Sequence, residues 1–93
     1  MRAIEWTSHF KRDYRRVAVG RERTSLDTLL RSVLTRLAMD DPLPSHFRDH
    51  ALTGNSRDCR DCYLKPNLVL IYRKPDNATL QLVRLGAHNQ LGL

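Results

Sequence analysis

The sequence has 93 residues, of which 41% are hydrophobic and 28% charged, a composition typical of a globular domain and not of a disordered or fibrous chain. Sixteen Lys and Arg residues against ten Asp and Glu give a formal charge of +6, with a pI near 10.0. This surplus favours a polyanionic partner, nucleic acid first among them. We expect one small domain over residues 1–93.

The sequence shows no sign of export or membrane insertion. Residues 1–16 are too rich in charge for a signal peptide, and the longest apolar run, Leu68–Tyr72, is far shorter than the roughly 20 residues of a membrane-spanning helix. The only cysteines, Cys59 and Cys62, form one C-x-x-C, which is half of a structural zinc site. Their strand-like neighbours favour free thiols, surface-lying or half-buried. We expect a soluble cytoplasmic protein with no metal, no other cofactor and no membrane partner.

The chain begins with a predicted strand and helix. Residues 2–6 alternate as in a short β-strand. Thr7 or Ser8 can cap the helix that follows, in which apolar residues recur at i, i+4, i+7 and i+8 from Phe10. Gly20 is expected to end this helix.

A second helix is expected to start after Thr24 or Ser25. From Leu26 to Leu37, leucine and valine recur at nearly 3.6-residue spacing, which predicts one buried helical face. The segment 40–44 contains two prolines and interrupts the helical pattern, since proline lacks an amide donor. One further helical turn is expected over residues 45–48.

The C-terminal half changes to short strands divided by turns. Strands are expected at His50–Leu52, Arg60–Leu64, Leu68–Arg73 and Thr79–Leu85, with turns at Gly54–Asn55 and Pro75–Asn77. The run Leu68–Tyr72 is apolar without alternation, as in a central strand covered on both faces. Helices followed by a meander predict an α+β fold, a small antiparallel sheet backed on one face by the two helices.

The first candidate site is the basic face of the first helix and the segment after it. Its basic residues are Lys11, Arg12, Arg15, Arg16, Arg21 and Arg23, set against the acidic Asp13 and Glu22. Thirteen of the sixteen basic residues in the chain are arginine, which can bind phosphate through two parallel hydrogen bonds. Contact with RNA, a merely solvated helix face and a surface for an acidic protein all fit this pattern.

The second candidate is a set of histidine, arginine and tyrosine residues in the C-terminal half: His50, Tyr63, Arg84 and His88, with Arg48, Arg60 and Arg73 near in sequence. Metal-independent RNA cleavage needs a base for the 2′-hydroxyl, an acid for the 5′-oxygen and a fixed cation on the phosphorane. Histidine suits both proton roles and arginine stays charged. Spacing alone leaves surface histidines as the alternative interpretation.

Four motifs in segment 47–88 identify a family resemblance. They are D-H-x-L-x-G from Asp49, R-D-x-x-x-x-P from Arg60, L-I-Y from Leu70, and R-x-G-x-H from Arg84. In this order and spacing they resemble the YafQ-type branch of the RelE/ParE toxin superfamily. The N-terminal strand, the two helices and the proline-rich link extend the resemblance over nearly the whole chain.

The resemblance implies a bacterial type II toxin with a twisted antiparallel sheet, an endoribonuclease that enters the ribosomal A site and cuts translated mRNA. By position, His50, Arg84 and His88 match the family's active-site residues. Tyr63 stands where the family usually has histidine, and Asn67 where it usually has aspartate. Tyr63 is kept among the catalytic candidates, because other branches of the superfamily use tyrosine.

The expected partners are mRNA and rRNA at the ribosomal A site, and an acidic, partly disordered, DNA-binding antitoxin. The residues expected to bind RNA are Lys11, Arg12, Arg15, Arg16, Arg60 and Asn67. Two alternatives stay open, a non-catalytic inhibitor of DNA gyrase on the same scaffold, as in the ParE branch, and a degenerate toxin that only binds its antitoxin. The retained His50, Arg84 and His88 favour the nuclease over gyrase poisoning, which needs no proton transfer.

Overall fold

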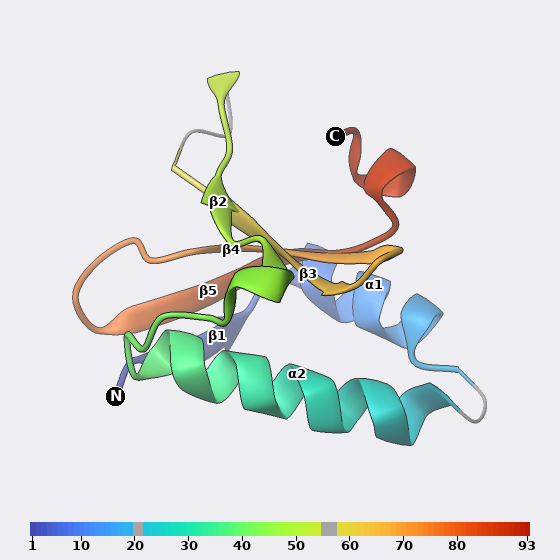
Figure 1. Cartoon of the computed structure of the whole chain (residues 1–93), viewed down its shortest axis with the longest axis horizontal. Helices are drawn as coiled ribbons and strands as arrows, with labels where there is room; N and C mark the ends of the chain where they lie inside the picture. Colours follow the sequence, from blue (N-terminus) through green and yellow to red (C-terminus); the bar gives the residue numbers. More distant parts are fainter. Residues whose placement is uncertain (20–21, 55–57) are drawn as a thin grey trace.

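The computed structural model describes residues 1–19, 22–54 and 58–93. Its elements are β1 (Ala3–Trp6), α1 (Ser8–Val17), α2 (Glu22–Ala38), the 3-10 turn η1 (Ser45–Phe47), β2 (His50–Ala51), β3 (Arg60–Lys65), β4 (Leu68–Arg73), β5 (Thr79–Gly86) and the 3-10 turn η3 (His88–Leu91). The strands form one sheet in the order β1-β5-β4-β3-β2 (Figure 1). The expected α+β class is confirmed.

The sheet is mixed, because its first strand breaks the antiparallel pattern. β1 pairs parallel with β5, from Ala3 opposite Thr79 to Trp6 opposite Leu82, whereas all other neighbours are antiparallel. The long connection that a parallel pair needs is the chain between β1 and β5, which contains both helices and the three strands β2, β3 and β4. The central position of β4 explains why its residues Leu68–Tyr72 are all buried.

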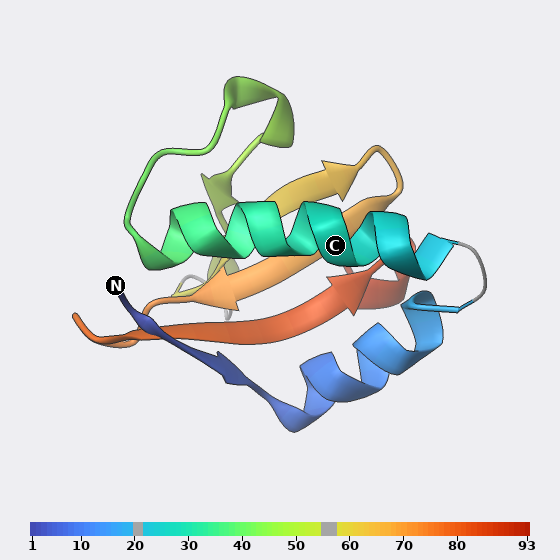
Figure 2. The same ribbon diagram turned by 90° about the horizontal axis from the view of Figure 1, so that it is seen from below.

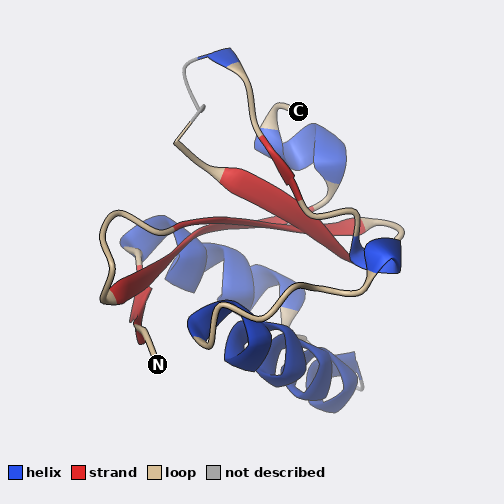
Figure 3. Cartoon of the chain, turned by 60° about the vertical axis from the view of Figure 1, so that its left-hand side comes forward, coloured by secondary structure: helices blue, strands red, loops and turns tan. Residues whose placement is uncertain are grey.

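Both helices lie on one face of the sheet, as Figure 1 and Figure 2 show. The core between them and the sheet includes the fully buried Phe10, Val33, Leu70, Leu80, Leu82 and Leu85. β2 and η3 project on the other side, seen also in Figure 3. We call the side of the sheet opposite the helices the open face. A smaller apolar cluster around Val69 and Ile71 lies on this side.

The helix boundaries agree with the sequence in part. Thr7 caps α1, since its Oγ1 accepts a hydrogen bond from the Phe10 amide at 3.1 Å. α2 begins at Glu22, earlier than the expected start after Thr24 or Ser25. Gly20, the expected end of the first helix, lies outside the described residues. α1 itself ends at Val17.

Other local expectations have mixed outcomes. The turn at residues 45–48 is confirmed as η1, and Gly54 has a φ of 68°, which fits a turn, although Asn55 lies outside the described residues. β2 spans only His50–Ala51, and Leu52, which was expected in the strand, packs against the cluster on the open face. None of the described helices is both long enough and apolar enough to cross a membrane.

The two cysteines are more deeply buried than predicted. Cys62 is fully buried in the core under the helices, and Cys59, 9% exposed, packs with the cluster on the open face. Burial is the largest cause that raises the pKa of each thiol, that of Cys62 to about 12. The C-x-x-C spacing therefore places the two sulfurs in separate apolar environments as neutral thiols.

Candidate active site

A cavity of about 380 Å³ on the open face brings together three titratable side chains from three elements. His50 comes from β2, Asp61 from β3 and His88 from η3. Leu52, Thr53, Gly92 and Leu93 complete its walls. His50 and His88 are 38 residues apart in sequence, so only the folded sheet places two imidazoles around one cavity.

His50 is oriented by two oxygen atoms. Its Nδ1 lies 2.7 Å from the carbonyl oxygen of Arg48, and its Nε2 lies 2.8 Å from Oδ1 of Asp61. In the tautomer with Nδ1–H, the ring donates to the Arg48 carbonyl and Nε2 is the nitrogen that faces Asp61. More than half of the His50 side chain is exposed, so the ring remains accessible to a ligand on the open face.

Asp61 is the buried member of this group. The residue is only 1% exposed, and its Oδ1 has no hydrogen bond of good geometry. The closest basic group to this oxygen is the His50 imidazole, with Nε2 at 2.8 Å. Burial raises the pKa of Asp61 above its ordinary value, and positive charge on His50 and His88 partly offsets that rise. Positive charge on either histidine therefore favours the ionised form of the buried carboxylate.

Tyr63 lies beside His88, with 6.2 Å between the ring centroids. It shares the open face with Asp61 because the two are separated by two positions on β3. Gly86, opposite Val69 at the end of β5, leaves room for η3 to return over the sheet. A Cβ at this position would lie 3.0 Å from Oε1 of Gln90 and 3.2 Å from Nη2 of Arg16.

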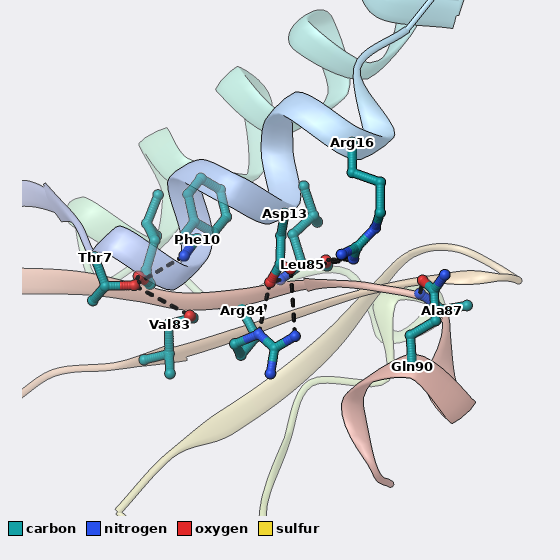
Figure 4. Close-up of polar contacts among 10 residues, drawn as sticks. Thr7, Phe10, Asp13, Arg16, Val83, Arg84, Leu85, Ala87 and Gln90 are labelled. Atoms are coloured by element: carbon teal, nitrogen blue, oxygen red, sulfur yellow. Dashed lines mark hydrogen bonds and ion pairs between the residues drawn. The ribbon is translucent and has the colours of Figure 1, made fainter.

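Arg84 stands on the opposite side of the open face from His50. One cross-strand row joins them: His50 opposite Asp61, Asp61 opposite Ile71, and Ile71 opposite Arg84. Since neighbouring strands lie about 4.8 Å apart, three spacings separate the His50 and Arg84 backbones by roughly 14 Å. Arg84 is held at β5 by Asp13 of α1, through Nε at 2.7 Å and Nη2 at 3.3 Å (Figure 4).

Two predicted RNA-binding residues lie away from this cavity. Arg60 shares the helix-covered side of β3 with Cys62, and its Nε lies 3.2 Å from Oδ1 of Asp49. Asn67, in the β3–β4 turn, borders a different cavity with Val17 and other residues near the helices. Neither is brought together with His50 and His88.

The basic face of α1 is exposed at Lys11, Arg12 and Arg15. Arg16 is exposed as well, but it is also paired, with Nη2 3.1 Å from Oδ1 of Asp13. Asp13, which the sequence presented as an acidic member of a solvated face, is 3% exposed. The expectation that Asp13 belongs to a solvated helix face is therefore wrong, because Asp13 packs inward on the same side of α1 as Phe10.

Asp13 and Asp61 are the site residues that sequence reasoning missed. A signal existed for each. Asp13 lies three positions after the buried Phe10 and thus on the inward face of the helix. Asp61 alternates with the core residue Cys62 and so shares a face with Tyr63.

The comparisons with known proteins agree with this architecture. The family model described as "Bacterial toxin of type II toxin-antitoxin system, YafQ" matches residues 2–92. This chain belongs to the YafQ toxin family. The mRNA interferase toxin YafQ of Escherichia coli is 31% identical over 91 residues, covering 97% of this chain and 95% of that protein. A Haemophilus influenzae protein that carries the YafQ name is 38% identical over 69 residues, which are 71% of this chain and 64% of the relative.

Solved YafQ-like structures have the same fold. A copper-bound mutant toxin from Helicobacter pylori superposes with a TM-score of 0.86 at 31% identity, covering 98% of this chain and 99% of that one. YafQ in the E. coli DinJ–YafQ complex gives 0.80 at 28% identity, with 98% of each chain covered. In the described part of the present chain, no group of three or more His, Cys, Asp or Glu side chains is arranged to hold a metal ion, and we assign no step to one.

Proposed function

We propose that this YafQ-family toxin is a ribosome-dependent endoribonuclease that cuts mRNA by attack of the 2′-hydroxyl on the adjacent phosphate. The observation that carries the proposal is the cavity lined by His50, Asp61 and His88. Two imidazoles at one cavity can supply both a proton acceptor and a proton donor, which this reaction requires. The E. coli relative is named an mRNA interferase, which supports the same chemistry.

Each polar side chain on the open face has a distinct role in this mechanism. His50, in its neutral form with Nδ1–H donating to the Arg48 carbonyl, takes the 2′-hydroxyl proton at Nε2, and Asp61 stabilises the imidazolium that forms. His88 protonates the leaving 5′-oxygen. Tyr63, beside His88, donates a hydrogen bond from its hydroxyl group to the phosphate. Arg84 supplies the permanent positive charge for the phosphorane from the β5 side.

The proposed partners follow from charge and from the relatives. mRNA and rRNA at the ribosomal A site are polyanions, which suits the net charge of +6 and the exposed basic residues of α1. A structure of E. coli YafQ in complex with DinJ supports an antitoxin partner, which we expect to be acidic and partly disordered. Because the proposed target is the ribosome, we expect the protein to act in the cytoplasm.

The experiment that tests this function maps mRNA 5′ ends after brief induction of the toxin. Ribosome-dependent cleavage leaves breaks in register with codons, and a His50→Ala, His88→Ala double variant should leave none. Random breaks, or growth arrest without breaks, would contradict the proposal. Arrest that requires DNA gyrase would instead indicate the non-catalytic activity of the ParE branch.

A further inference from the structure

Asp13 is a buried carboxylate outside the cavity. It is 3% exposed and, with Asp61, is one of two buried charged residues in the part of the chain that the structure describes. Figure 4 shows it pointing from α1 toward β5, where its neighbours are Arg84, Leu85 and Arg16. A carboxylate is buried at high cost unless it is paired and hydrogen-bonded, so these contacts are what keep Asp13 in place.

Four donors surround the Asp13 carboxylate. Oδ2 accepts from Arg84 Nε at 2.7 Å and from the Leu85 amide at 2.9 Å, while Oδ1 lies 3.3 Å from Arg84 Nη2 and 3.1 Å from Arg16 Nη2. Burial by itself raises the pKa of Asp13, but the hydrogen bonds from Arg84 and Leu85 and the charges of both arginines outweigh it and leave the pKa below its ordinary value. The group is therefore an ionised acceptor at neutral pH.

The Leu85 contact fixes the carboxylate to the backbone of β5. β1 pairs with β5 only as far as Leu82, so the strand edge beyond that residue is covered by α1 instead. Oδ2 of Asp13 accepts a hydrogen bond from the amide of Leu85, the residue directly after Arg84. The same oxygen accepts a hydrogen bond from Nε of Arg84. The position of the Arg84 side chain is thus set by the packing of α1 on β5.

We propose that Asp13 is a positioning residue that holds the Arg84 guanidinium in the orientation that binds the phosphate under attack, an inference that rests on the proposed function. A guanidinium has five N–H groups, and Asp13 engages Nε and one N–H of Nη2. Three N–H groups remain for the phosphate. Two arginines against one carboxylate also leave the cluster positively charged.

The orientation matters because an unrestrained arginine must be ordered in each reaction. Holding the side chain in advance removes this cost from the transition state, and a displacement of about 1 Å can reduce a rate by roughly 100-fold. The structure provides such restraint for Arg84, whose side chain is 30% exposed while that of Asp13 is 4% exposed. The exposed part of the arginine is available to RNA and the bound part is fixed by the helix.

The test uses the Asp13→Asn variant of the full chain. Asn keeps the shape and one oxygen for the Leu85 amide but lacks the charge and the second acceptor that grip Arg84. We would measure the single-turnover rate of mRNA cleavage on programmed ribosomes, and separately the affinity of the toxin for the same ribosomes. We expect the rate to fall by about 10- to 100-fold while ribosome affinity changes little.

A double-mutant cycle with Arg84→Ala separates positioning from a structural role. If Asp13 acts through Arg84, Asp13→Asn should cause no further loss of rate in the Arg84→Ala background. An equal loss in both backgrounds, or a wild-type rate for Asp13→Asn beside a slow Arg84→Ala variant, would overturn the inference. A wild-type rate for Arg84→Ala itself would instead contradict the role that the proposed function gives to Arg84.

Two additions keep the test decisive. Asp40→Asn is the matched control, because Asp40 also pairs with two basic residues, Arg2 and Lys74, but lies outside the site. Its cleavage rate should equal that of the wild type.

If Asp13→Asn fails to fold, Asp13→Glu replaces it, and the Arg84 Nε–H signal in NMR shows whether the hydrogen bond from Arg84 to the carboxylate is kept. A variant that loses this signal but cleaves at full rate would also overturn the inference.

Discussion

His50 and Asp61 face each other across the β2–β3 pair, with the imidazole Nε2 2.8 Å from the carboxylate Oδ1. The relationship is unequal, because the imidazole is largely exposed and the carboxylate is buried. Burial disfavours the charged form of Asp61 and raises its pKa, and positive charge on His50 offsets that rise only in part. Asp61 therefore lowers the stability of the fold at neutral pH, and we expect it to be there for activity.

Asp61→Asn is expected to stabilise the fold at pH 7. Because burial raises the pKa of Asp61, the folded state binds its proton more tightly than the unfolded state does, and stability falls as pH rises above the ordinary value of 3.8. The variant has no such penalty, so its melting temperature should exceed that of the wild type at pH 7 but not below pH 3.8. Thermal unfolding at both pH values measures this, and a lower melting temperature at pH 7 would contradict it.

The same Asp61→Asn variant should be a slower nuclease. Without the carboxylate, His50 loses its charge partner at Nε2 and keeps only the bond to the Arg48 carbonyl, so the ring is less well oriented. We expect the single-turnover cleavage rate to fall by roughly 10- to 100-fold, measured on programmed ribosomes. A rate equal to that of the wild type would show that Asp61 does not orient the base.

Asp13→Asn is expected to have the opposite effect on stability. The pKa of Asp13 is lowered in the folded state, so its contribution is present above the ordinary value of 3.8 and is lost as pH falls through the folded-state pKa. The variant should lose roughly 1–3 kcal/mol of unfolding free energy at pH 7, because buried donors lose their partner. Urea unfolding across pH tests this, since the difference should shrink toward acid pH.

His88→Ala should reduce mRNA cleavage by about 10²- to 10⁴-fold, because a general acid is lost from the cavity. His9→Ala is the matched control, since His9 is an exposed histidine on α1 away from that cavity. Cleavage on programmed ribosomes compares the two. If both variants cleave at the wild-type rate, His88 is not the proton donor.

The exposed basic residues of α1 should set the salt dependence of ribosome binding. Replacing Lys11, Arg12 and Arg15 with Gln removes charges that can displace counterions from RNA, and each lost phosphate contact should flatten the log–log salt slope by roughly 0.7 to 0.9. Arg16 is omitted because it is tied to Asp13. Arg31→Gln on α2 is the control, and an unchanged slope in the triple variant would mean that this face is only solvated.

The elements of the fold were predictable where one local signal dominated. The leucine spacing from Leu26 to Leu37 predicts α2, and the unbroken apolar run from Leu68 predicts the central β4. The sequence offers Thr7 or Ser8 as the cap of α1, and the structure has Thr7. These signals are local, because helical periodicity, capping and strand burial depend on residues close in sequence. The four motifs in segment 47–88 likewise indicate the YafQ family from residue types and spacing alone, and the family match over residues 2–92 confirms it.

Only the tertiary structure decided which side chains meet. The sequence alone determined that His50, His88 and Arg84 are present, but their grouping depends on strand order and register, which no local pattern encodes. The fold placed both histidines at one cavity with Asp61, set Arg84 about three strand spacings from His50, and buried Asp13 against β5. It also kept Arg60 and Asn67 away from that cavity, since alternation and a turn direct them elsewhere. Residue types and local periodicity are properties of the chain, whereas these pairings arise from long-range packing.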